Sequence, residues 1–312
     1  MEKKRLRLVL IFVCSLITLS CADQKQVARQ SLGRLNIPYN EDSFVEKARD
    51  GDLTAVQLFL QAGMDSNVTN KRGQTASIVA ARYGRAEVLS FLLANGGDPN
   101  STDQEFGATP LIWAAVGGFP KIAAELLEHG AKIDSREKKN GLDALLSAAA
   151  AGKTEVLELL LEKGAYIDSR DNSERTPLMW AVSRGHMETV RALLEKGADA
   201  GAAEKDLGLS ALSLAAITGK TDILKMVLEK GAKIDLPDKH GKTALMLAAQ
   251  NGRTETVQVL LEKGADATPK DEEGHTALDL AKAGKAVEVV ALLEKTGDSA
   301  EKSEPSDRGG KP

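Results

Sequence analysis

Short apolar stripes with the period of an α-helix dominate the hydrophobic pattern of this chain. After residue 186, Val190, Leu193 and Leu194 recur at i, i+3 and i+4, whereas Glu188 and Arg191 fall outside the stripe. Apolar residues at this spacing lie on one face of a helix, and that face needs a neighbouring element to cover it. The pattern predicts a short amphipathic helix with one buried face.

A more apolar segment precedes this helix, over residues 177–184. Thr176 can accept a hydrogen bond at the start of a helix, and Pro177 suits the first turn because no donor is needed there. Gly185 readily adopts the left-handed conformation that ends a helix. The sequence therefore predicts two consecutive short helices in this region.

The same pattern recurs along the chain. The stretches TPLIWAAVGG at 109–118 and TPLMWAVSRG at 176–185 align residue by residue. The glycine that ends each such block stands at positions 51, 84, 118, 152, 185, 219, 252 and 284. One helix pair has no second layer, so its stability must come from stacking on its neighbours.

The extra residues of the longer repeats fall at 100–107, 134–141 and 201–208, so these connections should differ in shape from the others.

The period, together with T-P-L and A-A at fixed offsets, resembles the ankyrin repeat, a unit of about 33 residues with a T-P-L-H-x-A signature. The resemblance covers roughly Asn40 to Gly297 in eight units, although residues such as Ile112 and Met179 replace the family's histidine. It implies an all-α solenoid of about eight helix-turn-helix units with protruding hairpin-like fingers. It also implies a protein-protein interaction module without catalysis.

Both ends of the repeat region depart from the repeat pattern, as the caps of a solenoid must. The first unit reads FVEKARDG over 44–51, and the last carries Lys282 and Lys285. We interpret residues 21–39 as a linker and residues 40–297 as the ankyrin-repeat domain. Residues 298–312, which have almost no apolar side chains, are expected to form a disordered tail.

The first 20 residues have a different composition from the repeats. A basic segment precedes the apolar run Leu8 to Leu19, which is shorter than the roughly 20 residues that span a bilayer. A basic start, a short apolar run and then small residues are typical of a secretory signal peptide, here residues 1–20. We therefore expect the protein to be exported.

Cys21 directly follows this run, and the chain has one other cysteine, Cys14. The segment resembles the lipobox of bacterial lipoproteins, in which such a cysteine is acylated and becomes the mature N-terminus. Thr18 stands where that pattern usually has leucine. The resemblance implies a lipid anchor at Cys21 in the cell envelope, at the outer membrane facing the periplasm.

An alternative cleavage uses the same residues. Ser20 and Ala22 have the small-x-small spacing of an ordinary signal-peptidase site, and a cut before Asp23 would give a soluble periplasmic or secreted protein. Either cut leaves a mature chain without cysteine pairs, so no disulfide is expected.

Charge and motifs exclude several classes of function. Without residues 1–20 the chain has 37 basic and 44 acidic residues, a net charge of −7, which disfavours a nucleic-acid partner. The four histidines lie in separate units without metal-ligand spacing, and no phosphate loop or nucleophile motif is present. We expect no metal, cofactor, catalytic residue or small-molecule substrate. The alternatives are an accessory or inhibitor protein of an envelope enzyme, and an enzyme with its site on the solenoid surface.

Partners of ankyrin-repeat proteins usually bind a concave face formed by finger tips and the exposed ends of inner helices. For this chain, the resemblance implies a surface that binds another protein. The residues of this surface are Arg82, Tyr83, Phe106, Asn140, Arg175, Arg184, His240 and Asn251. Trp113 and Trp180 share a slot that leucine fills in other units, so we interpret both as core residues.

Overall fold

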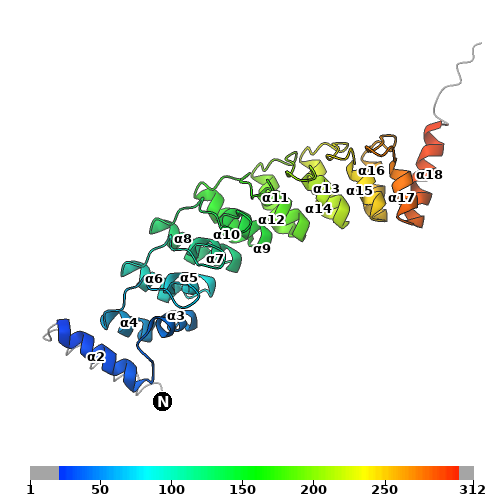
Figure 1. The fold of residues 1–312 in the computed structure, drawn as a ribbon. Helices are drawn as coiled ribbons and strands as arrows, with labels where there is room; N and C mark the ends of the chain where they lie inside the picture. Colours follow the sequence, from blue (N-terminus) through cyan, green and yellow to red (C-terminus); the bar gives the residue numbers. More distant parts are fainter. Residues whose placement is uncertain (1–20, 302–312) are drawn as a thin grey trace, which may run out of the picture. The chain divides into compact units, whose positions relative to one another are not determined.

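The computed structural model describes residues 21–301, which form 17 helices and no extended sheet (Figure 1). They divide into two compact units, with the boundary between Lys139 and Asn140. The expected signal peptide, residues 1–20, and residues 302–312 lie outside the described part of the chain.

The first unit contains one preceding helix and three helix pairs. The preceding helix is α2 (Cys21–Arg34), and the pairs are α3 (Glu41–Asp50) with α4 (Leu53–Gln61), α5 (Ala76–Arg82) with α6 (Ala86–Ala94), and α7 (Pro110–Gly117) with α8 (Pro120–Glu128). We call the first helix of each pair inner and the second outer. Inner helices pack on inner helices, α3 on α5 and α5 on α7, and outer helices pack on outer helices (Figure 1).

The second unit contains five pairs with the same arrangement. They are α9 (Ala144–Ala151) with α10 (Thr154–Glu162), α11 (Pro177–Arg184) with α12 (Met187–Glu195), α13 (Ala211–Thr218) with α14 (Thr221–Glu229), α15 (Ala244–Gln250) with α16 (Thr254–Glu262), and α17 (Ala277–Ala283) with α18 (Val287–Glu301). The inner helices α9, α11, α13, α15 and α17 form one layer, and the outer helices form the other. The all-α architecture of about eight helix pairs that the resemblance to ankyrin repeats implied is confirmed.

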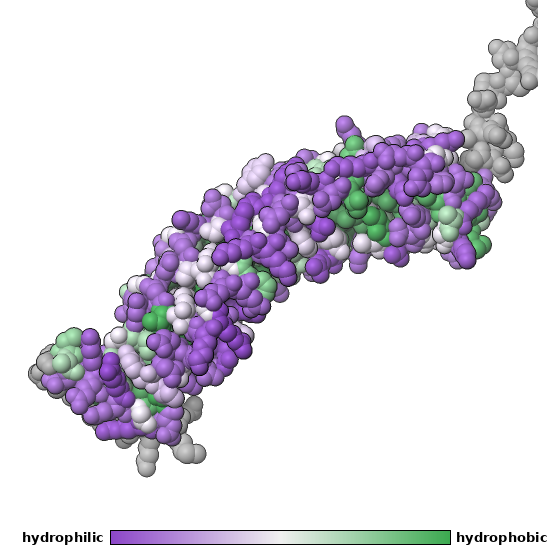
Figure 2. All heavy atoms as spheres, in the orientation of Figure 1, coloured by the Kyte–Doolittle hydropathy of each residue, from purple (hydrophilic) through white to green (hydrophobic). Residues whose placement is uncertain are grey.

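The core of each unit lies between these two layers. Val190 and Leu193 on α12 are fully buried, whereas Arg191 on the same helix is exposed, which confirms the predicted stripe. Burying one such aliphatic side chain contributes about 1.5–3 kcal/mol, and every pair repeats the pattern. Figure 2 accordingly shows a mainly hydrophilic surface over the described residues.

Polar side chains begin the inner helices, as the sequence predicts. The Thr176 hydroxyl accepts a hydrogen bond from the Met179 N–H at 3.3 Å, and Gly185 ends α11 with φ 77°. The residues that cap the other inner helices after α3 in this way are Thr75, Thr109, Asp143, Ser210, Thr243 and Thr276. A cap of this type contributes about 1 kcal/mol, so the start of each unit is fixed locally.

The structure differs from the expected linker over residues 21–34, which form α2. This helix packs against α4 and buries Ala28 and Leu32, two residues at helical spacing. Arg29 lies over the ring of Tyr39, 4.6 Å from its centroid, and Tyr39 stacks on Phe59 of α4. The helix therefore covers an apolar end of the first unit that a linker would have left open to water.

The last helix also departs from the expectation. α18 extends to Glu301, beyond residue 298, where the disordered tail was expected to begin. Among the helices of residues 21–301, none combines the length and apolar character needed to cross a bilayer.

Candidate protein-binding surface

A carboxylate or amide side chain organises each finger, the connection between one helix pair and the next. Oδ1 of Asp171 accepts hydrogen bonds from the N–H groups of Ser173 at 2.9 Å and Arg175 at 2.8 Å. Asn70, Asp103, Glu137, Glu204, Asp238 and Asp271 hold the other fingers in the same manner. We call these seven residues the finger acceptors. Because they satisfy the finger's own donors, the finger shape is set before any partner arrives.

Two of the fingers expected to be longer are confirmed as such. The N–H of Asp103 bonds to the carbonyl of Ala108, and that of Glu204 bonds to Leu209, each five residues along. In the shorter finger the N–H of Asp171 bonds to Arg175, four residues along. The repeat length therefore varies through one added residue in a solvated connection, and the helices keep their register.

In the second unit, the guanidinium groups of two arginines lie over the ring of Trp180 of α11. The guanidinium carbon of Arg175, from the finger, is 5.4 Å from the indole centroid, and that of Arg184, at the end of α11, is 5.7 Å away. The indole Nε1 donates to Oδ2 of the buried Asp171 at 2.9 Å. We call Arg175, Trp180 and Arg184 the Trp180 cluster. Helical spacing places Arg184 one turn after Trp180, and the finger brings Arg175 to it.

In the first unit, Trp113 of α7 contacts one arginine and one aromatic residue. Arg82 from α5 lies 4.0 Å above its ring, and Phe106 from the finger meets it edge-on at 5.7 Å. Tyr83, which is 46% exposed, lies beside Arg82. The indole Nε1 donates to Oδ2 of Asp103 at 2.7 Å. We call Arg82, Tyr83, Phe106 and Trp113 the Trp113 cluster.

These positions change the interpretation of the two tryptophans. Trp113 and Trp180 are partly exposed, as is Leu214 in the same repeat slot, whereas Leu247 and Leu280 in that slot are buried. The expectation that both tryptophans serve as core residues is therefore incomplete, because each presents part of its ring to solvent beside arginine. The sequence signal that could have found them is the acidic residue nine or ten positions before each tryptophan, at Asp171 and Asp103.

The structure brings five of the eight predicted surface residues to these clusters. Arg82, Tyr83 and Phe106 gather at Trp113, and Arg175 and Arg184 gather at Trp180. The other three have local roles elsewhere in the second unit. The carbonyl of Asn140 accepts from Asn172 N–H, that of His240 accepts from Glu272 N–H, and the side chain of Asn251 donates to Leu247 O.

The finger of the Trp180 cluster carries a strained residue. Glu174 has φ 61°, in the left-handed region where the other fingers place a glycine, such as Gly241 and Gly274. A non-glycine residue in that region costs of the order of 1 kcal/mol. Glu174 forms an ion pair with Arg170 at 3.4 Å, and the next residue, Arg175, lies over the indole.

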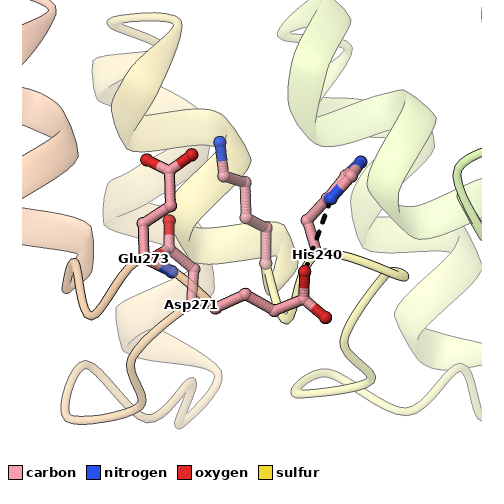
Figure 3. Close-up of a pocket in the computed structure, with 5 residues that line it drawn as sticks. His240, Asp271 and Glu273 are labelled. Atoms are coloured by element: carbon pink, nitrogen blue, oxygen red, sulfur yellow. Dashed lines mark hydrogen bonds and ion pairs between the residues drawn. The ribbon is translucent and has the colours of Figure 1, made fainter.

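A small polar pocket lies at the last two fingers of the second unit (Figure 3). His240, Lys242, Asp271, Glu272 and Glu273 line it. His240 Nδ1 is 3.7 Å from Glu272 Oε2, and both side chains are mostly exposed. No group of three metal-ligating side chains with suitable geometry occurs among residues 21–301. We interpret this pocket as a space between solvated charged side chains at the finger tips.

Two of the buried finger acceptors, Glu204 and Asp271, have a lowered pKa. Burial raises the pKa of Glu204, but N–H donors from Asp206, Leu209 and Leu207 outweigh it, so the pKa lies below its ordinary value. The pKa of Asp271 is likewise lowered, because N–H groups of the finger outweigh its burial. Both carboxylates therefore stay ionised and serve the fold.

Known protein families and structures match the stacked helix pairs of this chain. A family model described as ankyrin repeats matches three stretches, residues 44–137, 133–204 and 212–303. The crystal structure of the human ASB11 ankyrin repeat domain superposes with a TM-score of 0.65 at 27% sequence identity, covering 72% of this chain and 98% of that one.

Curated relatives share shorter segments. An ankyrin repeat-containing protein of Treponema pallidum (strain Nichols) is 33% identical over 85 residues, which is 27% of this chain and 28% of that protein. Ankyrin repeat domain-containing protein 17 of Mus musculus is 42% identical over 72 residues, 22% of this chain and 3% of the mouse protein. The chain thus matches less than a third of the length of either relative. Since the family model covers well over half of the chain, the protein belongs to the ankyrin-repeat family.

Proposed function

We propose that this protein is a non-catalytic recognition module that binds another protein through the Trp113 cluster and the Trp180 cluster. The observation that carries the proposal is that each unit holds a partly exposed tryptophan against at least one arginine. Tryptophan, tyrosine and arginine are the residues most enriched among those that dominate binding energy at protein interfaces.

The clusters are also preorganised. The Asp171–Trp180 hydrogen bond fixes the indole, and the same carboxylate fixes the finger that carries Arg175. A surface held in its binding conformation loses little entropy on association, which favours affinity. A preorganised surface of this composition fits a role in binding another protein.

We propose further that the protein is exported and lipid-anchored at Cys21. The basic and apolar segments before residue 20, followed directly by this cysteine, support this part of the proposal. Because α2 begins at Cys21, an acyl group there would connect to the folded first unit without an intervening linker. A soluble envelope protein, cut before Asp23, is the competing outcome.

Two experiments test the two parts. Affinity capture with the wild-type protein and with Trp113→Ala and Trp180→Ala variants tests the surface: at least one variant should lose the bound partner while keeping its helical circular dichroism spectrum. Undiminished capture by both variants contradicts the assignment. Intact-mass analysis of the mature N-terminus tests the anchor: a diacylated or triacylated Cys21 is expected, and a chain that begins at Asp23 contradicts it.

A further inference from the structure

We propose that the Trp180 cluster recognises a segment of the partner in which two carboxylate side chains flank an apolar residue. This inference rests on the proposed function and specifies the partner of the same surface. The grounds are the charge balance around Trp180 and the position of the two guanidinium groups relative to its ring.

Within residues 21–301, the arginines of the cluster are not held in an ion pair. Among the described residues, neither Arg175 nor Arg184 forms an ion pair, and both side chains are exposed. Exposed guanidinium groups bind carboxylates with charge-assisted hydrogen bonds, which are about twice as strong as neutral ones. A carboxylate from outside is therefore the group that complements them.

The acidic side chains near the cluster are already engaged. Asp171 uses Oδ1 for two finger N–H groups and Oδ2 for the indole N–H. Glu174 forms its ion pair with Arg170. Glu204, which lies close enough to Arg175 to interact with its charge, accepts three backbone hydrogen bonds in its own finger. These carboxylates are held in place by their own partners, and none of them forms an ion pair with Arg175 or Arg184.

The indole ring indicates which side chain of the partner would accompany the two carboxylates. Both guanidinium carbons are within 6 Å of the ring centroid, and part of the ring remains exposed. An apolar side chain can cover the part of the indole that stays exposed, while the arginines attract the ring through cation–π interactions. A peptide with acid, apolar and acid positions satisfies all three groups, whereas a free phosphate uses only the arginines.

The Trp113 cluster provides an internal contrast. It has a single arginine, Arg82, and adds the rings of Phe106 and Tyr83. This composition favours apolar and aromatic contacts over paired carboxylates. The preference for acidic segments should therefore be a property of the Trp180 cluster, and the Trp113 cluster should show it only weakly.

The two tryptophans allow a direct test by fluorescence. They are the only tryptophans of the chain, so in a Trp113→Phe background the emission reports on Trp180 alone. The probe is acetyl-Glu-Leu-Glu-amide, and the control is the uncharged acetyl-Gln-Leu-Gln-amide. The acidic peptide should change the emission saturably and bind at least about tenfold more tightly than the control, and the difference should shrink as salt is raised.

Arginine variants assign the effect to the cluster. Arg175→Gln and Arg184→Gln should each weaken binding of the acidic peptide by about threefold to tenfold. Arg191→Gln is the matched control, because this exposed arginine lies on the outer helix α12 and pairs with Glu188. Its affinity for the peptide should be unchanged, and circular dichroism should show the same helix content for all variants.

Three results would overturn the inference. They are equal binding of the uncharged peptide, an equal emission change with inorganic phosphate, and no saturable change up to about 20 mM peptide, well above the millimolar range of weak contacts. Equal binding of the uncharged peptide would remove the acidic preference but leave the tryptophan surface in place. The capture experiment on Trp113→Ala and Trp180→Ala tests that surface separately.

Discussion

The indole nitrogen of Trp180 donates a hydrogen bond to Oδ2 of Asp171 at 2.9 Å, while Oδ1 of the same carboxylate accepts from the finger N–H groups. One side chain thus joins the finger to the inner helix. Trp113 and Asp103 repeat the relationship at 2.7 Å in the first unit. The arrangement explains how a partly exposed tryptophan keeps one orientation without being buried.

Asp171→Asn should separate the two functions of this carboxylate. An asparagine oxygen can still hold the finger, as Asn70 does for Arg72 and Gln74. The amide NH2 would face the indole N–H, so a donor would be left without an acceptor at a cost of about 1–3 kcal/mol. Urea unfolding should show this loss together with altered Trp180 emission. Stability equal to wild type would mean that the indole hydrogen bond contributes nothing.

Leu280→Trp should stabilise the last repeat. Oδ2 of Asp271 is buried without a hydrogen-bond partner, and Leu280 stands nine residues later, as Trp180 does after Asp171. An indole in this slot would supply the donor and add about 0.5–1.5 kcal/mol. Thermal unfolding measures the gain.

Leu247→Trp is the matched control for that substitution. Leu247 occupies the same slot nine residues after Asp238, but Asp238 is only partly buried and no orphaned oxygen is found on it. A smaller gain is expected because water already satisfies a partly exposed carboxylate. Equal effects of the two substitutions would show that the orphaned oxygen of Asp271 is not the cause.

Leu193→Ala should lower the free energy of unfolding by about 2–5 kcal/mol, since this side chain is fully buried between α12 and its neighbours. Leu207→Ala, at a finger position that is 46% exposed, should change it by less than about 0.5 kcal/mol. Chemical denaturation with circular dichroism compares the two. If the two losses were similar, the assignment of buried and exposed stripes would fail.

Acid should destabilise the fingers. The folded-state pKa of Glu204 lies below its ordinary value of 4.5, so ionised Glu204 stabilises the fold fully above that pH. This contribution is lost as the pH falls through the folded-state pKa. Glu204→Gln should therefore show a shallower decline in stability below pH 4.5 than the wild type, and the two curves should run parallel above it. Identical slopes in acid would contradict the role of this carboxylate.

The sequence was sufficient for the features that repeat. Thr176, Gly185 and the stripe through Leu193 act within one helix or turn, so local chemistry predicts them, and their period predicts the stacking. The finger acceptors also follow the repeat period, at 70, 103, 137, 171, 204, 238 and 271. Acidic residues are so common in this chain that the periodic ones do not stand out from the others.

Features that depend on neighbours could not be predicted in this way. α2 has two buried residues, Ala28 and Leu32. Its helical conformation is stabilised by packing against the apolar surface of α4, which the sequence of α2 does not reveal. The exposure of Trp180 likewise depends on Asp171 turning inward and on Arg175 reaching the ring from another element. Asp171 recurs at the repeat period, but an arginine in the slot of Arg175 does not, so the period could not predict its contact with the ring.

Position-specific photo-crosslinking of the full-length protein in its native cells tests the central proposal most directly. A photoreactive residue at Tyr83, beside Arg82 of the Trp113 cluster, or at Arg184, beside Trp180, should crosslink to a partner protein, whereas a residue at Arg191 on the outer helix α12 should not. Crosslinking from Arg191 at an equal yield, or none from Tyr83 and Arg184, would contradict recognition through the tryptophan clusters.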